Sequence, residues 1–383
     1  MKKTMSLYIH IPFCNSKCNY CNFVSFVSSE QEKLRYIEAL KNEIKLQSKI
    51  YSNLYSIRTI YIGGGTPSSL PLGAIKDIMQ TVYKYFTVKN NAEITIELNP
   101  NTVNEDKIRE YVVSGVNRFS IGLQCVSESV LKNMGRTHTI EDFEKSLEFI
   151  HEQGISNISA DLIIGYPGQS DKDVIESVKY LIKQKVPHIS CYMLSVENGT
   201  KLKTMVDTGL AYLPNEEKVV KIYQTVVNTL AKSGYERYEI SNFAKPGFTC
   251  KHNLVYWKRE DYLGVGVAAH SYMNGIRFSN TENLKTYIDC IEKTSKAPVC
   301  NVMKLTDKDK KEEFIMLSLR TNEGLDTVEY ENLFKENLIV SKKAVITNLI
   351  KLGFLTLDTK GVIKATNNGF LVLNKIILEL SSD

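Results

Sequence analysis

Three cysteines near the start of the chain have a spacing that suits metal chemistry. Cys14, Cys18 and Cys21 form the pattern CxxxCxxC, directly after an apolar run from Leu7 to Pro12 that is typical of a β-strand. The other five of the eight cysteines are scattered singly, as small buried side chains are. In a chain of 383 residues that needs no disulfide framework, such a cluster indicates metal or redox chemistry.

Two kinds of metal site fit this cluster. Three thiolates can bind three irons of a 4Fe-4S cluster and leave the fourth iron open for another ligand. A zinc ion takes four ligands, usually from two CxxC pairs, and here only His10 is close in sequence as a fourth. We favour the iron-sulfur cluster and keep zinc as the alternative.

Further candidate residues stand where strands are expected to end. The run Gly63-Gly64-Gly65-Thr66-Pro67 follows the second expected strand, and consecutive glycines let a ligand approach the backbone closely. Glu97 and Asp161 stand at the ends of later expected strands. Ligands bind at the carboxyl ends of parallel strands, although each carboxylate can equally cap a helix or pair with a cation.

Strand-like and helix-like segments alternate along the first 234 residues. Expected strands are Leu7 to Pro12, Thr59 to Ile62, Glu93 to Leu98, Arg118 to Leu123, Ser159 to Ile164 and His188 to Leu194. Expected helices include Glu30 to Ile50, Ile75 to Phe86, Asp142 to Gln153, Asp171 to Lys185 and Glu216 to Lys232. Six βα units predict an α/β fold with an open, partial (β/α)6 barrel, whose site lies at the C-terminal ends of the strands.

The regular alternation of strands and helices ends after Gly234. Tyr235 to Ile240 and Tyr262 to Ala268 are expected to be added strands around the segment Lys251 to Glu260. From about Thr281 the chain becomes mainly helical, and Ser341 to Leu380 resembles a winged-helix module with Lys360-Gly361 in its hairpin. We therefore expect three parts: a core over residues 1–234, added strands over 235–285 and a C-terminal domain over 286–383.

Composition narrows the function classes. Hydrophobic residues make up 43% and charged residues 24% of the chain, which is typical of a globular protein. The net charge of +5 comes from interspersed residues, so we expect no nucleic acid partner. The longest stretch without Asp, Glu, Lys or Arg, from Thr59 to Ile75, is too short and too rich in Gly and Pro to span a bilayer. We expect a cytoplasmic protein.

The cysteine pattern, with the aromatic Tyr20 before its last cysteine, resembles the signature of the radical S-adenosylmethionine (SAM) superfamily. The resemblance implies a radical SAM barrel with a 4Fe-4S cluster on Cys14, Cys18 and Cys21, whose open iron chelates SAM. It also implies that the glycine run grips the methionine end of SAM.

Within that superfamily, the run Tyr8-Ile9-His10-Ile11-Pro12-Phe13-Cys14 is similar to the porphyrin-related branch. This branch includes oxygen-independent coproporphyrinogen III dehydrogenases and haem chaperones of the HemW type. The resemblance covers nearly the whole chain, including a HemN-type C-terminal domain. It implies SAM contacts at Tyr8, Tyr20, Gly64, Gly65, Thr66, Glu97, Gln124, Arg136 and Asp161. Carboxylates suit ribose hydroxyls, and an arginine suits the SAM carboxylate.

Two departures separate this chain from the dehydrogenase pattern CxxxCxxCxC. Phe23 occupies the position of the additional cysteine, and only 13 residues precede Cys14, where the dehydrogenases carry a longer arm. A third feature, His252-Asn253-Leu254-Val255-Tyr256-Trp257, resembles the HNxxYW motif of the haem chaperones. The resemblance implies haem-binding roles for His252, Asn253, Tyr256 and Trp257, with Lys251, Lys258 and Arg259 near the propionates. Whether His252 itself ligates iron stays open, since an imidazole can also serve as a core residue.

The resemblance therefore implies a haem chaperone that carries a 4Fe-4S cluster and SAM. It would pass haem to haem-requiring acceptor proteins, including respiratory enzymes reached by docking at the membrane. Oxygen-independent coproporphyrinogen III dehydrogenase activity is the alternative. The sequence leaves open the productive cleavage of SAM, the acceptor and the oligomeric state, with a homodimer as one option.

Overall fold

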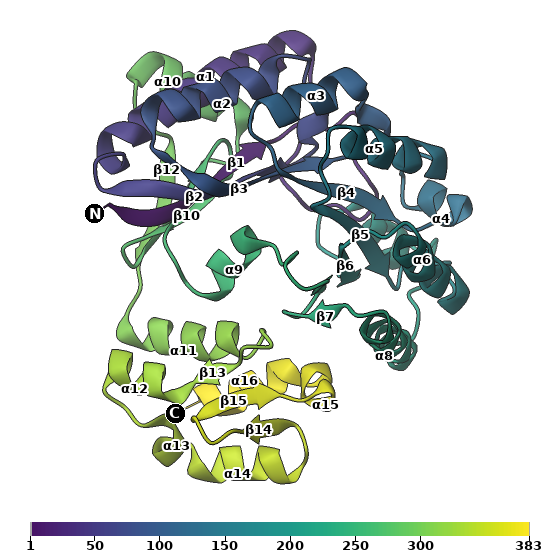
Figure 1. Cartoon of the computed structure of the whole chain (residues 1–383), viewed down its shortest axis with the longest axis vertical. Coiled ribbons are helices and arrows are strands. Elements are labelled where there is room, and N and C mark those ends of the chain that lie inside the picture. The colour runs from purple at the N-terminus through teal and green to yellow at the C-terminus, as the bar shows by residue number, and fades with distance from the viewer. Residues whose placement is uncertain (1, 383) are drawn as a thin grey trace.

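Six parallel strands, each followed by helices, form the centre of the molecule (Figure 1). The structure is a computed structural model that describes residues 2–382. The strands are β1 (Lys3–Ile11), β2 (Tyr55–Gly64), β3 (Val88–Leu98), β4 (Arg118–Gln124), β5 (Ile158–Ile164) and β6 (His188–Met193). They pair in chain order, which confirms the expected open barrel of βα units.

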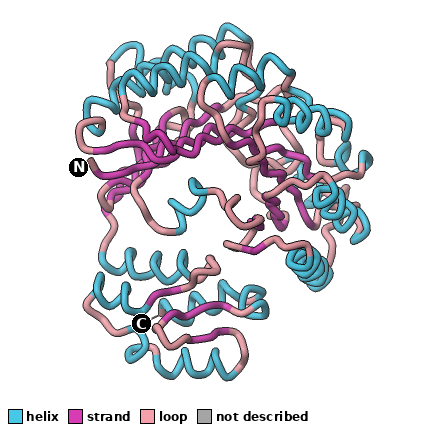
Figure 2. Tube along the Cα trace, in the orientation of Figure 1, coloured by secondary structure: helices cyan, strands magenta, loops and turns pink. Residues whose placement is uncertain are grey.

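Helices cover the outer face of this curved sheet (Figures 1 and 2). They are α1 (Glu30–Tyr51), α2 (Ala74–Tyr85), α3 (Glu105–Val113), α5 (Ile140–Glu152), α6 (Asp171–Lys183) and α8 (Glu216–Lys232), with short 3-10 turns at Pro67–Ser69 and Pro100–Thr102. Two short helices, α4 (Glu128–Asn133) and α7 (Lys201–Asp207), pack in a smaller cluster with Tyr20 of the cysteine loop. Capping boxes begin α5 at Thr139 and α6 at Ser170. The expected helices did not include α3, α4 and α7. Each of these helices is short and buries at most two residues, so its periodic pattern in the sequence is weak.

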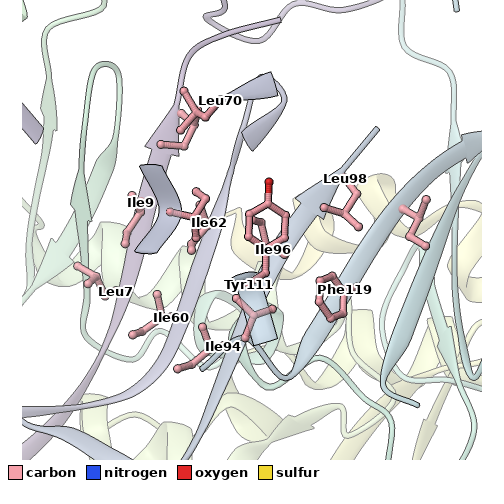
Figure 3. Packing of buried hydrophobic residues seen from close by; sticks show 14 of the residues in the cluster. Leu7, Ile9, Ile60, Ile62, Leu70, Ile94, Ile96, Leu98, Tyr111 and Phe119 are labelled. Carbon is pink, nitrogen blue, oxygen red and sulfur yellow. The ribbon is translucent and has the colours of Figure 1, made fainter. Parts of the chain in front are cut away.

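Alternation along the strands separates an apolar outer layer from a polar interior. Ile9, Ile62 and Ile96, on three neighbouring strands, point into the core between sheet and helices (Figure 3). The residues between them along each strand point the other way, into the barrel. Glu93 and Glu97 on β3 are of this second kind, so the pattern that buries the isoleucines also directs polar groups inward.

Additional strands extend both edges of the sheet. On one side β9 (Tyr262–Val265) runs parallel to β1, followed by the antiparallel strands β10 (His270–Met273), β11 (Ile276–Asn280) and β12 (Val299–Lys304). On the other, β8 (Asn242–Ala244) and β7 (Glu236–Arg237) follow β6. The strand expected over 235–240 is only two residues long. The segment around 251–260 contains a helix, α9 (Lys251–Trp257), and α10 (Leu284–Thr294) precedes β12.

The C-terminal part has a hydrophobic core of its own, which begins at Phe314. Its elements are α11 (Asp307–Ser318), β13 (Leu325–Asp326), α12 (Thr327–Phe334), α13 (Leu338–Ser341), α14 (Lys343–Lys351), β14 (Leu355–Leu357), β15 (Val362–Ala365), α15 (Asn367–Leu371) and α16 (Leu373–Ser381). The helix α14 and the hairpin β14–β15 match the expected winged-helix arrangement. The large sheet continues to Lys304, beyond the boundary expected at residue 286. Within residues 2–382, no helix combines the length and hydropathy needed to cross a bilayer.

A buried carboxylate, Glu43 on α1, joins this helix to the added strands. It accepts hydrogen bonds from the Gly266 backbone N–H (2.7 Å), the Tyr287 hydroxyl (2.6 Å) and the Asn280 amide (2.6 Å). Burial raises the pKa of Glu43 to about 7, although these donors act in the opposite direction. The three donors come from a loop, a strand and a helix, so one side chain fixes the strand extension against α1.

We expect the substitution Glu43→Gln to lower the free energy of unfolding by about 2–3 kcal/mol, because the amide must turn an N–H toward a buried donor. Urea denaturation would measure this, with the exposed Glu38→Gln on the same helix as control. The folded chain keeps the Glu43 proton up to a pKa of about 7, whereas the unfolded chain loses it near 4.5. The free energy of unfolding therefore falls as the pH rises between these two values. The variant should lose less stability over this pH range, and an equal loss would contradict the assignment.

Candidate functional site

A cavity of about 460 Å³ opens at the C-terminal ends of the barrel strands. It brings together all three cysteines of the CxxxCxxC pattern and eight of the nine residues expected to contact SAM. The eight are Tyr20, Gly64, Gly65, Thr66, Glu97, Gln124, Arg136 and Asp161. Tyr8 is the exception: it lies deeper in the barrel, where its ring stacks on Tyr61 and its hydroxyl bonds to His10 Nδ1 at 2.9 Å.

The cysteine loop follows β1 and is held at several points. The Cys14 backbone N–H donates to the Phe26 carbonyl (3.0 Å), and the Asn19 N–H donates to Met134 (2.9 Å). All three thiols are half-buried and unpaired by disulfides. Burial raises the pKa of Cys21, and the neighbouring thiols add to this rise. A bound cationic centre would relieve this effect, so the donor set fits a cluster held by three thiolates.

The zinc alternative lacks its fourth ligand. His10 Nδ1 bonds to the Tyr8 hydroxyl, and His10 Nε2 lies 3.0 Å from the Val24 carbonyl oxygen. Burial lowers the pKa of His10 to about 4, so the ring is a neutral core group. In the described part of the chain, no three Cys, His, Asp or Glu side chains lie close enough to share a single ion. Thiolates on three different irons lie farther apart than ligands of one zinc ion, so the cluster is the better fit.

The glycine run passes closely over two neighbouring segments. Gly64 has φ +114°, and a Cβ at this position would lie 2.5 Å from the His10 ring. A Cβ on Gly65 would lie 2.7 Å from the Phe13 carbonyl oxygen. A side chain at Gly64 would therefore meet the core histidine as well as the space beside the glycine run.

Two carboxylates face the cavity. Glu97 accepts hydrogen bonds from the Tyr61 hydroxyl (2.8 Å) and the Gly64 N–H (3.1 Å). Burial raises the pKa of Glu97 to about 7, and Asp161 close by adds to the rise. Asp161 accepts a hydrogen bond from Ser120 (3.3 Å), and burial raises its pKa too. Both groups line the cavity rather than cap a helix, and they can accept hydrogen bonds from ligand hydroxyls.

Arg136 is oriented by residues that sequence reasoning missed. Its Nη2 donates to the Gly122 carbonyl (2.7 Å) and to Asn99 Oδ1 (3.0 Å), while Nη1 lies 3.7 Å from Cys18 Sγ. Asn99 directly follows β3, and this place at the C-terminal end of a strand could have marked it as a candidate site residue in the sequence. Gln124, beside it in the cavity, has φ +67°, a strained conformation of the kind that clusters at functional sites.

The mouth of the cavity carries exposed apolar side chains. Phe23 is 63% exposed, and Tyr192 and Met193 at the end of β6 are 43% and 46% exposed. The sequence analysis did not name Tyr192 and Met193 as site residues. Tyr192 could have been found, because it shares the inward face of its strand with His188 and Ser190.

Comparisons with known proteins agree with this geometry. Residues 8–181 match the radical SAM superfamily, and residues 305–372 match the HemN C-terminal domain. The chain is 35% identical to the heme chaperone HemW of Lactococcus lactis over 98% of this chain and 97% of that protein. It is 32% identical to the heme chaperone HemW of Bacillus subtilis over 97% of each. The chain belongs to the HemW family of radical SAM proteins.

A solved structure confirms the fold of this HemW family member. Coproporphyrinogen III oxidase (HemN) from Escherichia coli superposes with a TM-score of 0.87 at 24% identity, covering 100% of this chain and 91% of that one. Membership of the radical SAM superfamily implies a 4Fe-4S cluster and SAM. Cys14, Cys18 and Cys21 would hold the cluster at the cavity described above.

The HNxxYW segment of this HemW family member forms α9, on the inner side of the barrel between the sheet and the C-terminal part (Figure 1). His252 is fully buried, while Asn253, Tyr256 and Trp257 are half-buried. The imidazole lies 2.8 Å from Thr59 Oγ1 through Nδ1 and 2.9 Å from the Tyr256 hydroxyl through Nε2. In this conformation His252 offers no free nitrogen to haem iron.

The two cations that follow α9 both contact the C-terminal part. Lys258 pairs with Glu323 at 2.8 Å. Arg259 lies 3.9 Å from the centre of the Phe314 ring and 3.8 Å from Glu329. These partners belong to the C-terminal part, so Lys258 and Arg259 connect the end of α9 to it. A contact of these cations with haem propionates stays a prediction. Lys251 is exposed.

Proposed function

We propose that this chain is a haem chaperone that binds haem and passes it to haem-requiring acceptor proteins. The observation that carries the proposal is the similarity, over nearly the full length of both chains, to proteins named heme chaperone HemW. Phe23 supports it, because this position holds a further cysteine in the dehydrogenase pattern. The likeness to the HemN structure concerns the fold and does not favour decarboxylation over haem binding.

The residues of the cavity support a place for SAM beside the cluster in this proposal. When bound, the cluster and SAM supply one-electron chemistry at a sulfonium. Arg136, held by Gly122 and Asn99, has the charge to orient a carboxylate next to Cys18. Glu97 and Asp161 can accept hydrogen bonds from ribose hydroxyls. Phe23, Tyr192 and Met193 at the mouth can exclude water from the bound ligand.

The acceptors in this proposal include respiratory enzymes at the membrane. The chain would reach them from the cytoplasm by docking, since no helix of residues 2–382 is long and apolar enough to cross a bilayer. The winged-helix-like C-terminal part serves in this proposal as a protein-docking module, with no nucleic acid partner. A homodimer is compatible with each of these roles.

The deciding experiment compares two activities of one anaerobically reconstituted preparation. We expect haem titration to give a saturable spectral change, and incubation with an apo-acceptor to move the haem to that protein. With SAM, a reductant and coproporphyrinogen III, we expect no protoporphyrinogen, because Phe23 stands at the position of the enzyme's additional cysteine. Formation of protoporphyrinogen over multiple turnovers, or the absence of haem binding, would overturn the proposal.

A further inference from the structure

The Arg136 guanidinium has a buried neighbour that the sequence patterns did not reveal, His138. Arg136 Nε donates to His138 Nδ1 at 3.3 Å, and His138 Nε2 lies 3.1 Å from the Leu123 carbonyl oxygen. An arginine only donates, so Nδ1 accepts and the ring proton is on Nε2. Burial and the charge of Arg136 lower the pKa of His138 to about 4, which agrees with a neutral ring. His138 therefore links the arginine to the end of β4.

Four of the five N–H groups of Arg136 have acceptors in the chain. Nε donates to His138, and Nη2 donates to Asn99 Oδ1 and to the Gly122 carbonyl oxygen. Nη1 donates to Cys18 Sγ at 3.7 Å. A guanidinium is a rigid plane, so acceptors at all three of its nitrogens fix both its position and its orientation. Without His138, no contact in the described part of the chain would hold the Nε edge of this plane.

The segment that carries Arg136 and His138 is attached to the cysteine loop. Asn19, the residue after Cys18, donates its backbone N–H to the Met134 carbonyl (2.9 Å) and its side-chain amide to the Asn133 carbonyl (2.8 Å). The next residue of the segment is a glycine with φ +77°, and an added Cβ there would lie 3.2 Å from the Asn19 side-chain oxygen. These contacts fix the distance between the arginine segment and the thiol.

The thiols of the cavity have different hydrogen-bond neighbours. Cys14 Sγ lies 3.5 Å from the Thr66 hydroxyl, which is a neutral group. Cys18 Sγ has the Arg136 guanidinium, the one cationic donor to a cavity thiol among the described residues. A positive charge stabilises the more negative of two oxidation states, and hydrogen bonds to the sulfurs help to set the reduction potential of an iron-sulfur cluster. The contact with Arg136 should therefore favour the reduced cluster.

We propose that His138 is a positioning residue that holds Arg136 on Cys18 and thereby raises the reduction potential of the cluster. His138 does not line the cavity, so it acts on the cluster only through the arginine. Residues behind the metal ligands commonly orient them and tune the metal in this way. The inference concerns the cluster alone, so it does not depend on the proposed transfer of haem.

A redox titration followed by electron paramagnetic resonance of the reduced cluster tests this, on the anaerobically reconstituted chain without SAM or haem. At a given ambient potential, we expect Arg136→Gln to lower the ratio of reduced to oxidised cluster about tenfold, because the charge beside Cys18 is lost. His138→Leu should lower this ratio about fivefold, because the guanidinium loses the acceptor of its Nε. The matched control is His151→Leu, which removes an exposed α5 histidine that also contacts a backbone carbonyl, and it should keep the wild-type ratio.

His138→Gln separates positioning from packing. Its amide can accept from Arg136 and donate to the Leu123 carbonyl, so the ratio should stay within about twofold of wild type. In the Arg136→Gln background, His138→Leu should cause no further change. An unchanged ratio in His138→Leu, equal losses in the leucine and glutamine variants, or an additional loss in the double variant would overturn the proposal.

Iron and sulfide analysis confirms that each variant carries a full cluster. If His138→Leu does not fold, His138→Asn takes its place, because its amide is one methylene shorter and reaches only one of the two partners. The asparagine variant should then lower the ratio more than His138→Gln does. Equal ratios in these two variants would contradict the positioning role.

Discussion

Replacing Cys18 by alanine should reduce the iron and acid-labile sulfide of the reconstituted chain from about four of each to below about one. Only three cysteines line the cavity, so the cluster has no spare thiolate to replace the lost one. Cys18 is also the thiol nearest to the Arg136 guanidinium, at 3.7 Å from Nη1. Its removal takes away both an expected iron ligand and a hydrogen-bond partner of that arginine.

Iron and sulfide analysis after anaerobic reconstitution measures this effect. Cys290→Ala is the matched control, because Cys290 is a half-buried cysteine on α10, outside the cavity. The control should retain the full content. A Cys18→Ala chain with wild-type iron and sulfide would show that the cysteine loop does not carry the cluster.

The substitution Gly64→Val should both destabilise the chain and abolish its affinity for SAM. A β-branched residue at φ +114° is strained, and its Cβ would lie 2.5 Å from the buried His10 ring. His10 cannot move away freely, because Tyr8 and Val24 hold both of its ring nitrogens. The Gly64 N–H also orients Glu97, so displacement of the glycine run alters a carboxylate of the cavity.

Gly73→Val separates the clash from the backbone strain. Gly73 has φ +93° with no heavy atom within 4 Å of an added Cβ. Backbone strain alone should therefore lower the free energy of unfolding of this control, by about 1–3 kcal/mol. Gly64→Val should cost at least about 2 kcal/mol more, as overpacking does. Urea denaturation and calorimetric titration with SAM measure the two effects. Equal stability of the two variants, with SAM affinity intact in Gly64→Val, would refute this account.

Contiguous patterns predicted much of this protein. The spacing of Cys14, Cys18 and Cys21, the glycine run and the alternation of strands and helices are local features, and the structure brings the cysteines and glycines into one cavity. This works because apolar alternation decides which strand faces are buried, and parallel strands bring their C-terminal ends to one edge. Residues named at those strand ends, such as Glu97 and Asp161, therefore lie together.

Tertiary contacts decided what local patterns could not. Whether His252 is exposed or enclosed depends on Thr59 and Glu93, which are 193 and 159 residues away in the chain. Glu43 looks like a surface residue of an amphipathic helix, yet its donors come from residues more than 220 positions later. A buried polar group is stable only where distant donors or acceptors meet it, and such partners become known only when the chain is folded.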